Sequence, residues 1–429
     1  MICRVRFLVG TAIFAVGLAS LTACKNSHEK KDVAENSKPR QAAPYTGSAK
    51  LEDVAAAKQR LEELGSAAIK LEDDGRLTEV VVQDGSNLSD DDLQAIGKLT
   101  DLRKLQIFNC RTLNDEMVNH LLGLAELQSL ALVNTVINDI SVEAIISSFP
   151  KLKELDLSSN TNLSAAALKQ ICEKKDLERL TLIQTGFNDI TTRRLARLED
   201  LRTLDLRGNM QAGDMTLESI SKLTKLTSFK HRSTAVTDYG MEHLSKNAAL
   251  ENLLIQDFAI TSQSGMYLAK LEKLKQLEIF RCPGFGSEGV LALKELKQLD
   301  RLTLRDLPSV DDQALEVFAE LPKLRRLYLH ELGSISDAGL THLSSIESLE
   351  LLDVWSVPQM TDASLEALSA LPNLKELSLR STDITDAAIE KILKLPALQS
   401  LTLKDNPRIT AEAMKQLSAR KWTKLDIDG

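Results

Sequence analysis

Five residues able to bind another molecule recur at intervals of 25 positions in the C-terminal half of the chain. They are Phe280, Arg305, His330, Trp355 and Arg380. Arginine presents a planar, charged fork of donors that fits carboxylate, phosphate or sulfate groups, and aromatic rings supply flat apolar area at low entropic cost. Tyrosine, tryptophan and arginine are also enriched at the energetic centres of protein interfaces. The spacing and the residue types therefore predict a binding surface.

Three neighbouring residues extend this predicted surface, which we name the arginine–aromatic cluster. Its members are Phe280, Arg301, Arg305, Arg326, Tyr328, His330, Trp355 and Arg380. Its chemistry suits either an acidic protein surface or an anionic glycan. A simpler interpretation is a solvated face whose side chains pair across strands, with Asp353 near Tyr328 and Arg326. The residues alone leave these alternatives open.

Motifs of the common catalytic sites are missing from the sequence. It contains no G-x-S-x-G, no H-E-x-x-H, no P-loop and no G-x-G-x-x-G, and its six histidines are scattered. His231 lies between Lys230 and Arg232, at a strand position that elsewhere holds an inward leucine. We expect it to be a buried neutral imidazole bonded to a backbone group rather than a switch or a ligand. The sequence therefore predicts a protein that is not an enzyme, with no metal site and no cofactor.

The 25-residue interval belongs to a repeat that runs through most of the chain. Between Leu77 and Asn406 the pattern Leu-x-x-Leu-x-Leu, or a close aliphatic variant, occurs fourteen times at intervals of 24 or 25 residues. In the block from Leu374 to Arg380, alternation predicts a strand with Leu377 and Leu379 facing inward. A turn and a helical pattern follow, so each repeat predicts one coil of strand, turn, helix and return loop. No coil can bury its leucines alone, so the coils must stack.

The repeat resembles the leucine-rich repeat. Its Leu-x-x-Leu-x-Leu-x-x-(Cys/Asn/Thr) core, followed by Ile-Thr-Asp and a helix, resembles the cysteine-containing class found in F-box-associated receptors. The resemblance implies an α/β solenoid of about 14 repeats, an arc or horseshoe with a concave parallel sheet and convex helices. At about 4.8 Å per strand the concave face would be on the order of 60 Å long, which suits a macromolecule. The seventh residue of each repeat, including the five residues named first, faces outward on it.

Two other repeat positions carry polar residues. Six helical patterns begin with Ser-Asp, Thr-Asp or Asp-Asp, which suits helix capping and the positive end of the helix dipole. These starts are Ser89-Asp90, Thr237-Asp238, Asp311-Asp312, Ser336-Asp337, Thr361-Asp362 and Thr385-Asp386. The ninth position holds small side chains that can satisfy turn backbone groups in a ladder. Its residues include Cys110, Thr135, Asn160, Thr185, Asn209, Thr234, Cys282, Thr382 and Asn406. We expect Cys110, Cys172 and Cys282 to be structural thiols.

The N-terminus has the layout of an export signal. Arg4 and Arg6 precede an apolar run from Phe7 to Ala19 that is too short to span a membrane. The next residues, Leu-Thr-Ala-Cys ending at Cys24, resemble the lipobox of bacterial lipoproteins. The resemblance implies a signal peptide over residues 1–23 and lipidation of Cys24, which anchors the exported chain in the cell envelope. Lys25 in place of Asp implies the outer membrane rather than the inner.

The remaining boundaries follow from composition and pattern. Residues 24–47 are polar and without apolar periodicity, so we expect a disordered tether. Residues 48–76 predict an N-terminal cap, a helix over 51–64 with Ser48 as a possible N-cap, followed by the first part of a hairpin. The repeats fill residues 77–421, and residues 422–429 predict a terminal strand in which Trp422 covers the last coil.

Charge and repeat architecture together predict a function. The formal net charge of −8 disfavours a general binder of polyanions, so we expect no nucleic acid partner. A solenoid presents a surface for holding another molecule. We expect a lipid-anchored scaffold of the bacterial cell envelope that binds a protein partner on its concave face. The alternative is an adhesin that binds glycan or peptidoglycan through Trp355 and Tyr328.

Overall fold

The computed structural model describes residues 49–427. The chain divides into two units, Met1–Arg40 and Gln41–Gly429, and the first lies entirely outside the described residues. The predicted signal peptide, Cys24, the tether and Ser48 are outside them as well. All described residues belong to the second unit.

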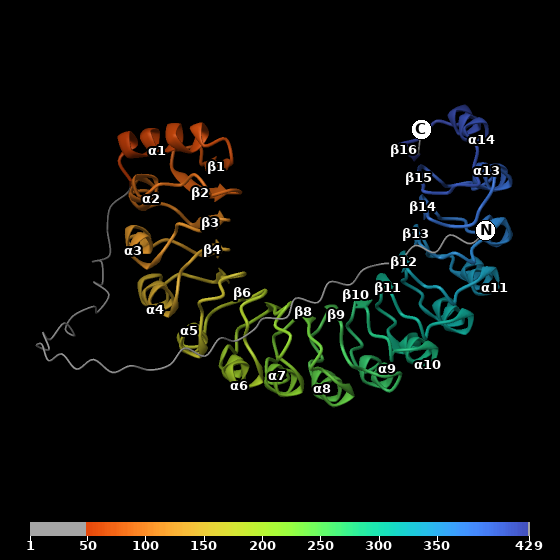
Figure 1. Cartoon of the computed structure of the whole chain (residues 1–429), viewed down its shortest axis with the longest axis horizontal. Helices are drawn as coiled ribbons and strands as arrows, with labels where there is room; N and C mark the ends of the chain where they lie inside the picture. Colours follow the sequence, from red (N-terminus) through yellow and green to blue (C-terminus); the bar gives the residue numbers. More distant parts are fainter. Residues whose placement is uncertain (1–48, 428–429) are drawn as a thin grey trace, which may run out of the picture. The chain divides into compact units, whose positions relative to one another are not determined.

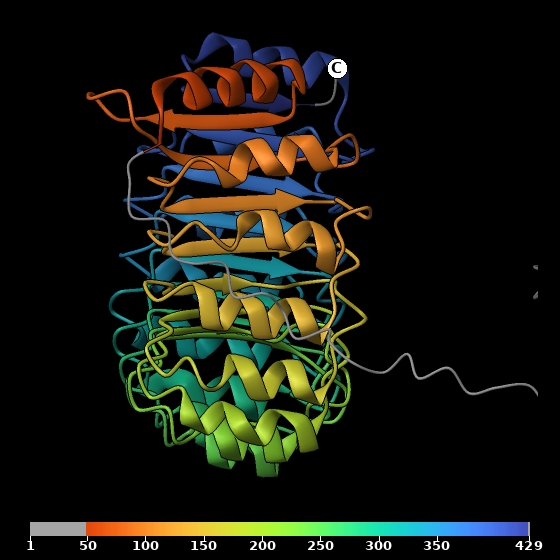
Figure 2. The same ribbon diagram turned by 90° about the vertical axis from the view of Figure 1, so that its left-hand side faces the viewer.

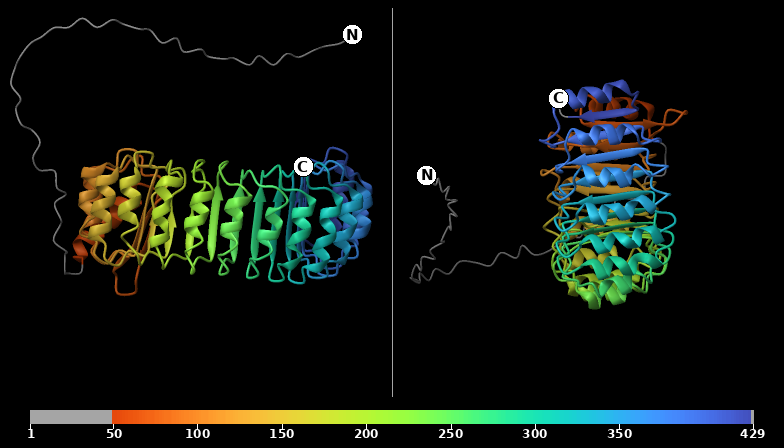
Figure 3. Two further views of the ribbon diagram at one scale, coloured as in Figure 1. Left: turned by 90° about the horizontal axis from the view of Figure 1, so that it is seen from below. Right: turned by 90° about the vertical axis from the view of Figure 1, so that its right-hand side faces the viewer.

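The second unit is built on one sheet of 16 strands whose order in space follows their order in the sequence. Strands β2 to β16 pair in parallel, and β1 joins β2 as an antiparallel hairpin. The strands line the inner side of an open arc and the helices its outer side (Figure 1). Figure 2 shows the strands stacked edge to edge, and Figure 3 shows the helices side by side along the convex surface. The predicted α/β solenoid with a concave parallel sheet is confirmed.

The strands are short and regularly spaced. They are β1 Ala67–Leu71, β2 Leu77–Val82, β3 Lys104–Phe108, β4 Ser129–Val133, β5 Glu154–Asp156, β6 Arg179–Thr181, β7 Thr203–Asp205, β8 Ser228–Arg232, β9 Asn252–Gln256, β10 Gln276–Phe280, β11 Arg301–Arg305, β12 Arg326–His330, β13 Leu351–Trp355, β14 Glu376–Arg380, β15 Ser400–Lys404 and β16 Lys424–Ile427.

One helical segment follows each strand from β2 to β15. The α-helices are α1 Leu51–Glu63, α2 Asp90–Gly97, α3 Asp115–Val118, α4 Asp139–Ser148, α5 Ala165–Ile171, α6 Asp189–Thr192, α7 Asp214–Ile220, α8 Asp238–Leu244, α9 Ser264–Leu268, α10 Ser287–Leu291, α11 Asp337–Thr341, α12 Asp362–Leu368, α13 Ala387–Leu393 and α14 Ala411–Gln416. The 3₁₀ helices are η1 Asn119–Leu121, η2 Arg193–Arg197, η3 Ala292–Glu295, η4 Asp312–Glu320, η5 His342–Ser345 and η6 Leu417–Ala419.

The leucines of each repeat form one continuous core between the sheet and the helices. In β14, Leu377 and Leu379 are buried whereas Glu376, Ser378 and Arg380 are partly or fully exposed on the concave side. Burying one leucine side chain contributes on the order of 1.5–3 kcal/mol. The strand alternation read from the sequence is therefore the alternation of the structure.

The residue that follows the strand turns the chain toward the helix by a left-handed backbone. At the eighth repeat position eleven non-glycine residues, from Asn109 to Asp405, have φ between 49° and 61°. Such a conformation costs a non-glycine residue about 1–2 kcal/mol, so the repeated turn imposes strain that stacking must offset. The eighth residue of the His231 repeat, Ser233, does not share it. Ser233 is buried there and Thr234 is exposed, so the prediction that Thr234 joins the ninth-position ladder is wrong.

Elsewhere the ninth-position ladder is present. Asn160 Nδ2 donates to the carbonyls of Leu132 and Leu157 at 2.7 and 2.9 Å. Its Oδ1 accepts from the amide and hydroxyl of Thr135 at 2.9 and 2.7 Å. One asparagine thus satisfies buried backbone groups of two repeats. Cys282, at the same position, is a free buried thiol, and burial raises its pKa to about 12.

A second ladder runs along the helix starts and was not predicted. The capping residues were expected to bond their own helices, as Thr361 does to the Ala363 amide at 3.2 Å. The aspartate that follows instead bonds the next repeat: Asp337 accepts from the amide and hydroxyl of Thr361 at 2.8 and 2.5 Å. Nine aspartates accept such bonds, namely Asp115, Asp139, Asp189, Asp214, Asp238, Asp312, Asp337, Asp362 and Asp386.

The first and last described elements cover the ends of the core. Helix α1 begins after Lys50, which makes no side-chain capping bond, and the backbone amide of Ala49 donates to the Asp101 carboxylate at 3.1 Å. At the other end, the indole of Trp422 packs against the core and donates to the Leu417 carbonyl at 2.7 Å.

Candidate binding surface

The strand register brings the five outward residues into one row across β10 to β14. Phe280 is paired with Arg305, Arg305 with His330, His330 with Trp355, and Trp355 with Arg380. Paired residues on adjacent parallel strands are about 4.8 Å apart. All five side chains are partly buried by their neighbours in the row. The geometry required by the predicted cluster is therefore present.

The indole of Trp355 lies between two guanidinium groups. Arg305, two strands before it, places its Cζ 4.8 Å from the ring centroid, and Arg380, on the next strand, places its Cζ 5.4 Å away. The imidazole of His330 meets the indole edge-on at 5.7 Å. Each cation–π contact contributes about 0.5–1 kcal/mol at an exposed site. Trp355 thus holds both arginines in place.

A second aromatic residue repeats this arrangement closer to the start of the strands. Arg301 lies with its Cζ 5.7 Å from the ring of Tyr328, and Tyr328 contacts His330 edge-on at 6.0 Å. All members of the cluster except Phe280 and Arg326 are thereby linked through ring contacts.

Carboxylates compensate part of the positive charge, though not in the pairing expected. Asp353 neighbours Tyr328 in the register, as predicted, but its ion pair is with Arg380 at 3.0 Å and not with Arg326. Its second neighbour is His330 Nε2 at 3.4 Å. Burial disfavours the charged form of Asp353, yet the adjacent His330 and Arg380 side chains outweigh it and lower its pKa.

Two further ion pairs complete the cluster's charge pattern. Arg326 bonds Asp300, which is shared with Arg325. Arg305 bonds Glu331 at 3.1 Å. Arg301 has no ion pair within residues 49–427. Carboxylates therefore compensate the positive charges of the cluster's arginines, with the exception of Arg301.

Unsatisfied donors concentrate in this network. Across the described residues, five buried side-chain nitrogen or oxygen atoms have no hydrogen-bond partner. Four belong to the cluster: the Nε atoms of Arg301, Arg326 and Arg380, and Nε2 of His330. Leaving such a group without a partner costs about 1–3 kcal/mol, and more for a charged one. Native structures contain few of them, so this network is the part of the described concave face whose polar groups the fold satisfies least.

Three hollows lie beside the row, two of them toward the starts of the strands and the third along β14 and β15. The first, of about 730 Å³, is lined by the segments entering β10 to β14, including Lys275, Asp300, Lys323, Arg325, Arg326 and Glu350. The second, of about 170 Å³, is lined by Arg325, Arg326, Glu350, Leu351, Lys375 and Glu376. The third, of about 350 Å³, lies over β13 to β16, and its lining includes Tyr328, Asp353, Arg380, Ser400, Thr402 and Lys404.

The predicted cluster overlaps the hollows in part. Of its residues, Arg326, Tyr328 and Arg380 line one of these three hollows, whereas Phe280, Arg301, Arg305, His330 and Trp355 line none of the three. The sequence prediction missed Arg325, Ser400 and Thr402, and it left Lys404, the outward seventh residue of its repeat, outside the cluster. Collecting the third and fifth repeat positions, besides the seventh, would have found Ser400 and Thr402.

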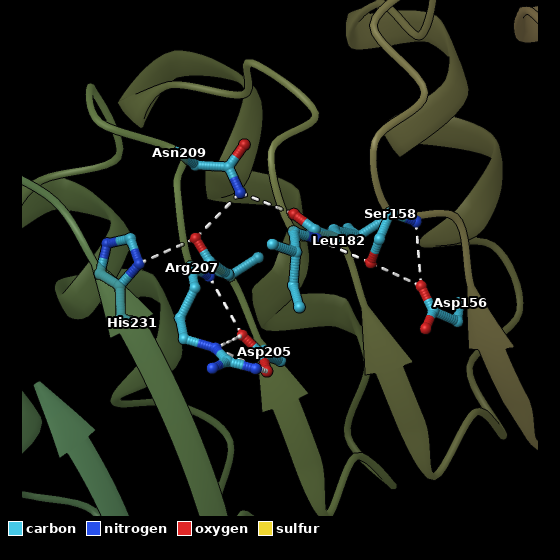
Figure 4. Close-up of polar contacts among 9 residues, drawn as sticks. Asp156, Ser158, Leu182, Asp205, Arg207, Asn209 and His231 are labelled. Atoms are coloured by element: carbon cyan, nitrogen blue, oxygen red, sulfur yellow. Dashed lines mark hydrogen bonds and ion pairs between the residues drawn. The ribbon is translucent and has the colours of Figure 1, made fainter. Parts of the chain in front are cut away.

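The middle of the concave face has a different polar network, drawn in Figure 4. Arg207 pairs with Asp205 at 2.8 Å, and Asp156 accepts from the amide and hydroxyl of Ser158 at 2.9 and 2.6 Å. Burial raises the pKa of Asp156 despite those bonds. These groups are satisfied within the fold, so this region does not share the unsatisfied donors of the cluster.

His231, at the edge of this network, is fully buried as predicted. Its Nδ1 lies 3.1 Å from the Leu206 carbonyl, the contact drawn as a dashed line in Figure 4. Its Nε2 lies 2.7 Å from the Ala212 carbonyl. Burial lowers its pKa more than these two carbonyls raise it, so the imidazole is neutral at pH 7. A neutral ring has one N–H, and the shorter contact assigns it to Nε2. Asn209 already donates to the Leu206 carbonyl at 2.9 Å.

Between residues 49 and 427 no group of three His, Cys, Asp or Glu side chains is placed to hold a metal ion. Over the same residues, none of the helices has the length and apolarity needed to cross a membrane.

Comparison with known proteins bears on the fold. An internalin of Listeria monocytogenes is similar with a TM-score of 0.50 and 21% identity, over 88% of this chain and 94% of that one. A chain of the yeast Rad7–Elc1 complex is similar with a TM-score of 0.55 and 17% identity, over 87% and 92%. No curated protein matches the sequence. The family model described as a leucine-rich repeat region matches residues 133–425, and the chain therefore belongs to the leucine-rich repeat family.

Proposed function

We propose that this protein is a lipid-anchored scaffold of the bacterial cell envelope, which binds a protein partner on the C-terminal part of its concave face. The observation that carries the binding role is the set of four unsatisfied donors in the arginine–aromatic cluster. Carboxylates of a partner would bind the exposed parts of the same network, since the side chains of Arg305, Arg326 and Arg380 are 38%, 34% and 32% exposed. The scaffold role requires no catalysis, and we assign none.

The aromatic rings of the cluster are already in contact with arginine side chains, which favours a protein partner over a glycan. A sugar binds an aromatic side chain by stacking on its open face. Arg305 and Arg380 approach the Trp355 ring from strands on its two sides, and Arg301 lies over Tyr328. A sugar would have to displace these cations, whereas an acidic protein surface would bind them where they lie. The glycan- or peptidoglycan-binding adhesin is therefore our second candidate.

Affinity capture from envelope proteins tests the binding role. The full chain should capture a protein that the double variant Trp355→Ala with Arg305→Ala loses. The matched control is Phe108→Ala with Arg179→Ala, which removes one aromatic side chain and one arginine from the opposite arm of the same face. Equal capture by parent and double variant would refute the site. A glycan array run with the same three proteins tests the second candidate.

The anchor is proposed from Cys24 and its preceding Leu-Thr-Ala. Lys25 supports the outer membrane as its place. Two or more acyl chains hold a protein stably at a bilayer. We predict that Cys24→Ala abolishes the incorporation of a labelled fatty acid without changing the thermal unfolding of the repeats. A variant that still takes up the label would exclude Cys24 as the attachment point.

A further inference from the structure

The three hollows beside the row on β10 to β14 share lining residues and therefore form one groove. Arg325, Arg326 and Glu350 line both the first and the second hollow. Leu351 and Glu376 line both the second and the third. The groove thus runs without interruption from the segment before β10 to β16, crossing the strands obliquely.

The length of the groove fits an extended polypeptide segment. From Lys275, at the start of β10, to Asp426 in β16 there are six steps between neighbouring strands. At about 4.8 Å a step this is about 29 Å, which an extended chain at about 3.3 Å per residue covers with about nine residues. A compact metabolite would occupy only one of the hollows.

The first part of the groove is basic. Arg325 and Arg326 share a single carboxylate, that of Asp300. The Nε atom of Arg326 is one of the four unsatisfied donors described above. A carboxylate from outside would give this pair of guanidinium groups its second acceptor, so this end suits acidic side chains.

The last part of the groove is neutral and rich in hydroxyl groups. The side chains of Ser378, Ser400 and Thr402 line it. Two ion pairs border them, Arg380 with Asp353 at 3.0 Å and Lys404 with Asp426 at 2.7 Å. Hydroxyls both donate and accept, so this floor suits the N–H and C=O groups of a polypeptide backbone.

We infer that the groove binds an extended segment of about nine residues, with acidic side chains over Arg325 and Arg326 and a polar, uncharged part over Ser400 and Thr402. The inference rests on the proposed function, because it names the part of the protein partner that the concave face recognises. The row of Phe280, Arg305, His330, Trp355 and Arg380 would contact the body of the partner while the groove holds this segment.

Two labelled nine-residue peptides test the groove on the full chain by fluorescence anisotropy. One carries four glutamates followed by glycine, serine and threonine, and the other has glutamine in place of each glutamate. Ser400→Trp fills the floor from an outward strand position. Ser228→Trp places the same side chain at the equivalent position of β8, outside the groove. The thermal unfolding of each variant shows whether it folds as the parent does.

The acidic peptide should bind the parent and the Ser228→Trp variant equally, and the Ser400→Trp variant at least tenfold more weakly. The glutamine peptide should bind the parent at least tenfold more weakly than the acidic one. Binding by Ser400→Trp at the parent's affinity, or no binding by the parent at millimolar peptide, overturns the inference. A captured partner lost by the Trp355→Ala, Arg305→Ala variant but kept by Ser400→Trp would leave the proposed function standing and remove the groove.

Discussion

At the scale of single residues, Trp355 connects the charges of the cluster. Its ring receives Arg305 and Arg380 and so restricts two long side chains before any partner arrives. Ordering an arginine side chain on binding costs about 0.5–1.5 kcal/mol. Because Trp355 already orders both arginines, less of this entropy is lost when a partner binds. The residue types alone could not show this role of Trp355.

The coupling between Arg305 and Trp355 can be measured without a partner. In a double-mutant cycle of Arg305→Ala and Trp355→Ala on the free energy of unfolding, we predict an interaction of about 0.5–1 kcal/mol, the range for an exposed cation–π contact. Glu331 also bonds Arg305, so a cycle of Arg305→Ala with Glu331→Ala separates the two contributions. A coupling of zero with Trp355 would mean that the stacked arrangement contributes no stability.

His231 predicts an acid sensitivity of the fold. Its pKa is lower in the folded chain than the ordinary value of about 6.5 in an unfolded one, so the unfolded state binds the proton more readily. The stabilising contribution is complete above pH 6.5 and declines as the pH falls toward the folded pKa, by up to about 1.4 kcal/mol per pH unit.

A glutamine at this position isolates that contribution, because it retains a donor for the Ala212 carbonyl and does not titrate. The free energy of unfolding of His231→Gln should lose less than that of the parent between pH 6.5 and 5. Parallel curves for the two proteins would show that His231 takes up no proton on unfolding.

At the scale of elements, the aspartate ladder joins consecutive helix starts. Asp337 lies in the first turn of α11 and accepts two hydrogen bonds from Thr361, one from its amide and one from its hydroxyl. We predict that Asp337→Ala lowers the free energy of unfolding by about 2–3 kcal/mol, because two hydrogen bonds to a charged acceptor are lost.

Glu316→Ala is the matched control for the ladder. Glu316 is an exposed carboxylate on the preceding η4. Substitutions of this kind usually change stability by less than about 0.5 kcal/mol. An equal effect of the two substitutions in chemical denaturation would show that the inter-repeat bonds do not contribute.

The ladder also marks where sequence reasoning stops at this scale. The Thr-Asp starts predict a capped helix, and the caps are present. The aspartate bonds the following coil because consecutive helix starts lie close together in the stacked solenoid. That distance is set by stacking and cannot be read from one repeat. The prediction for Thr234 was wrong for a related reason. The His231 repeat lacks the left-handed turn, and Ser233 points inward in place of Thr234.

At the scale of the whole molecule, period and alternation were sufficient to predict the solenoid and the row on β10 to β14. A 25-residue spacing places equivalent residues on adjacent strands once the coils are in register, and the register has no shift there. The groove could not be predicted in this way. Its floor consists of small residues such as Ser378 and Ser400, whose significance arises from the larger side chains around them.

The two arms of the solenoid differ in the outward residues of their concave faces. Outward residues on the first arm include Phe108, Val133 and Ile183, whereas the second arm carries the arginine–aromatic cluster. Because each repeat contacts only its neighbours, the two arms can be altered independently. This independence makes the first arm a control for the second.

Site-specific photo-cross-linking in living cells tests the central claim most directly. p-Benzoylphenylalanine is introduced at Tyr328, within the cluster, or at Phe108, on the concave face of the other arm. Both replacements substitute one aromatic side chain for another on the strand surface. We predict an adduct with a protein partner from position 328 and none from position 108. An adduct from position 108 alone, or equal adducts from both, would contradict a partner-binding site on the C-terminal arm.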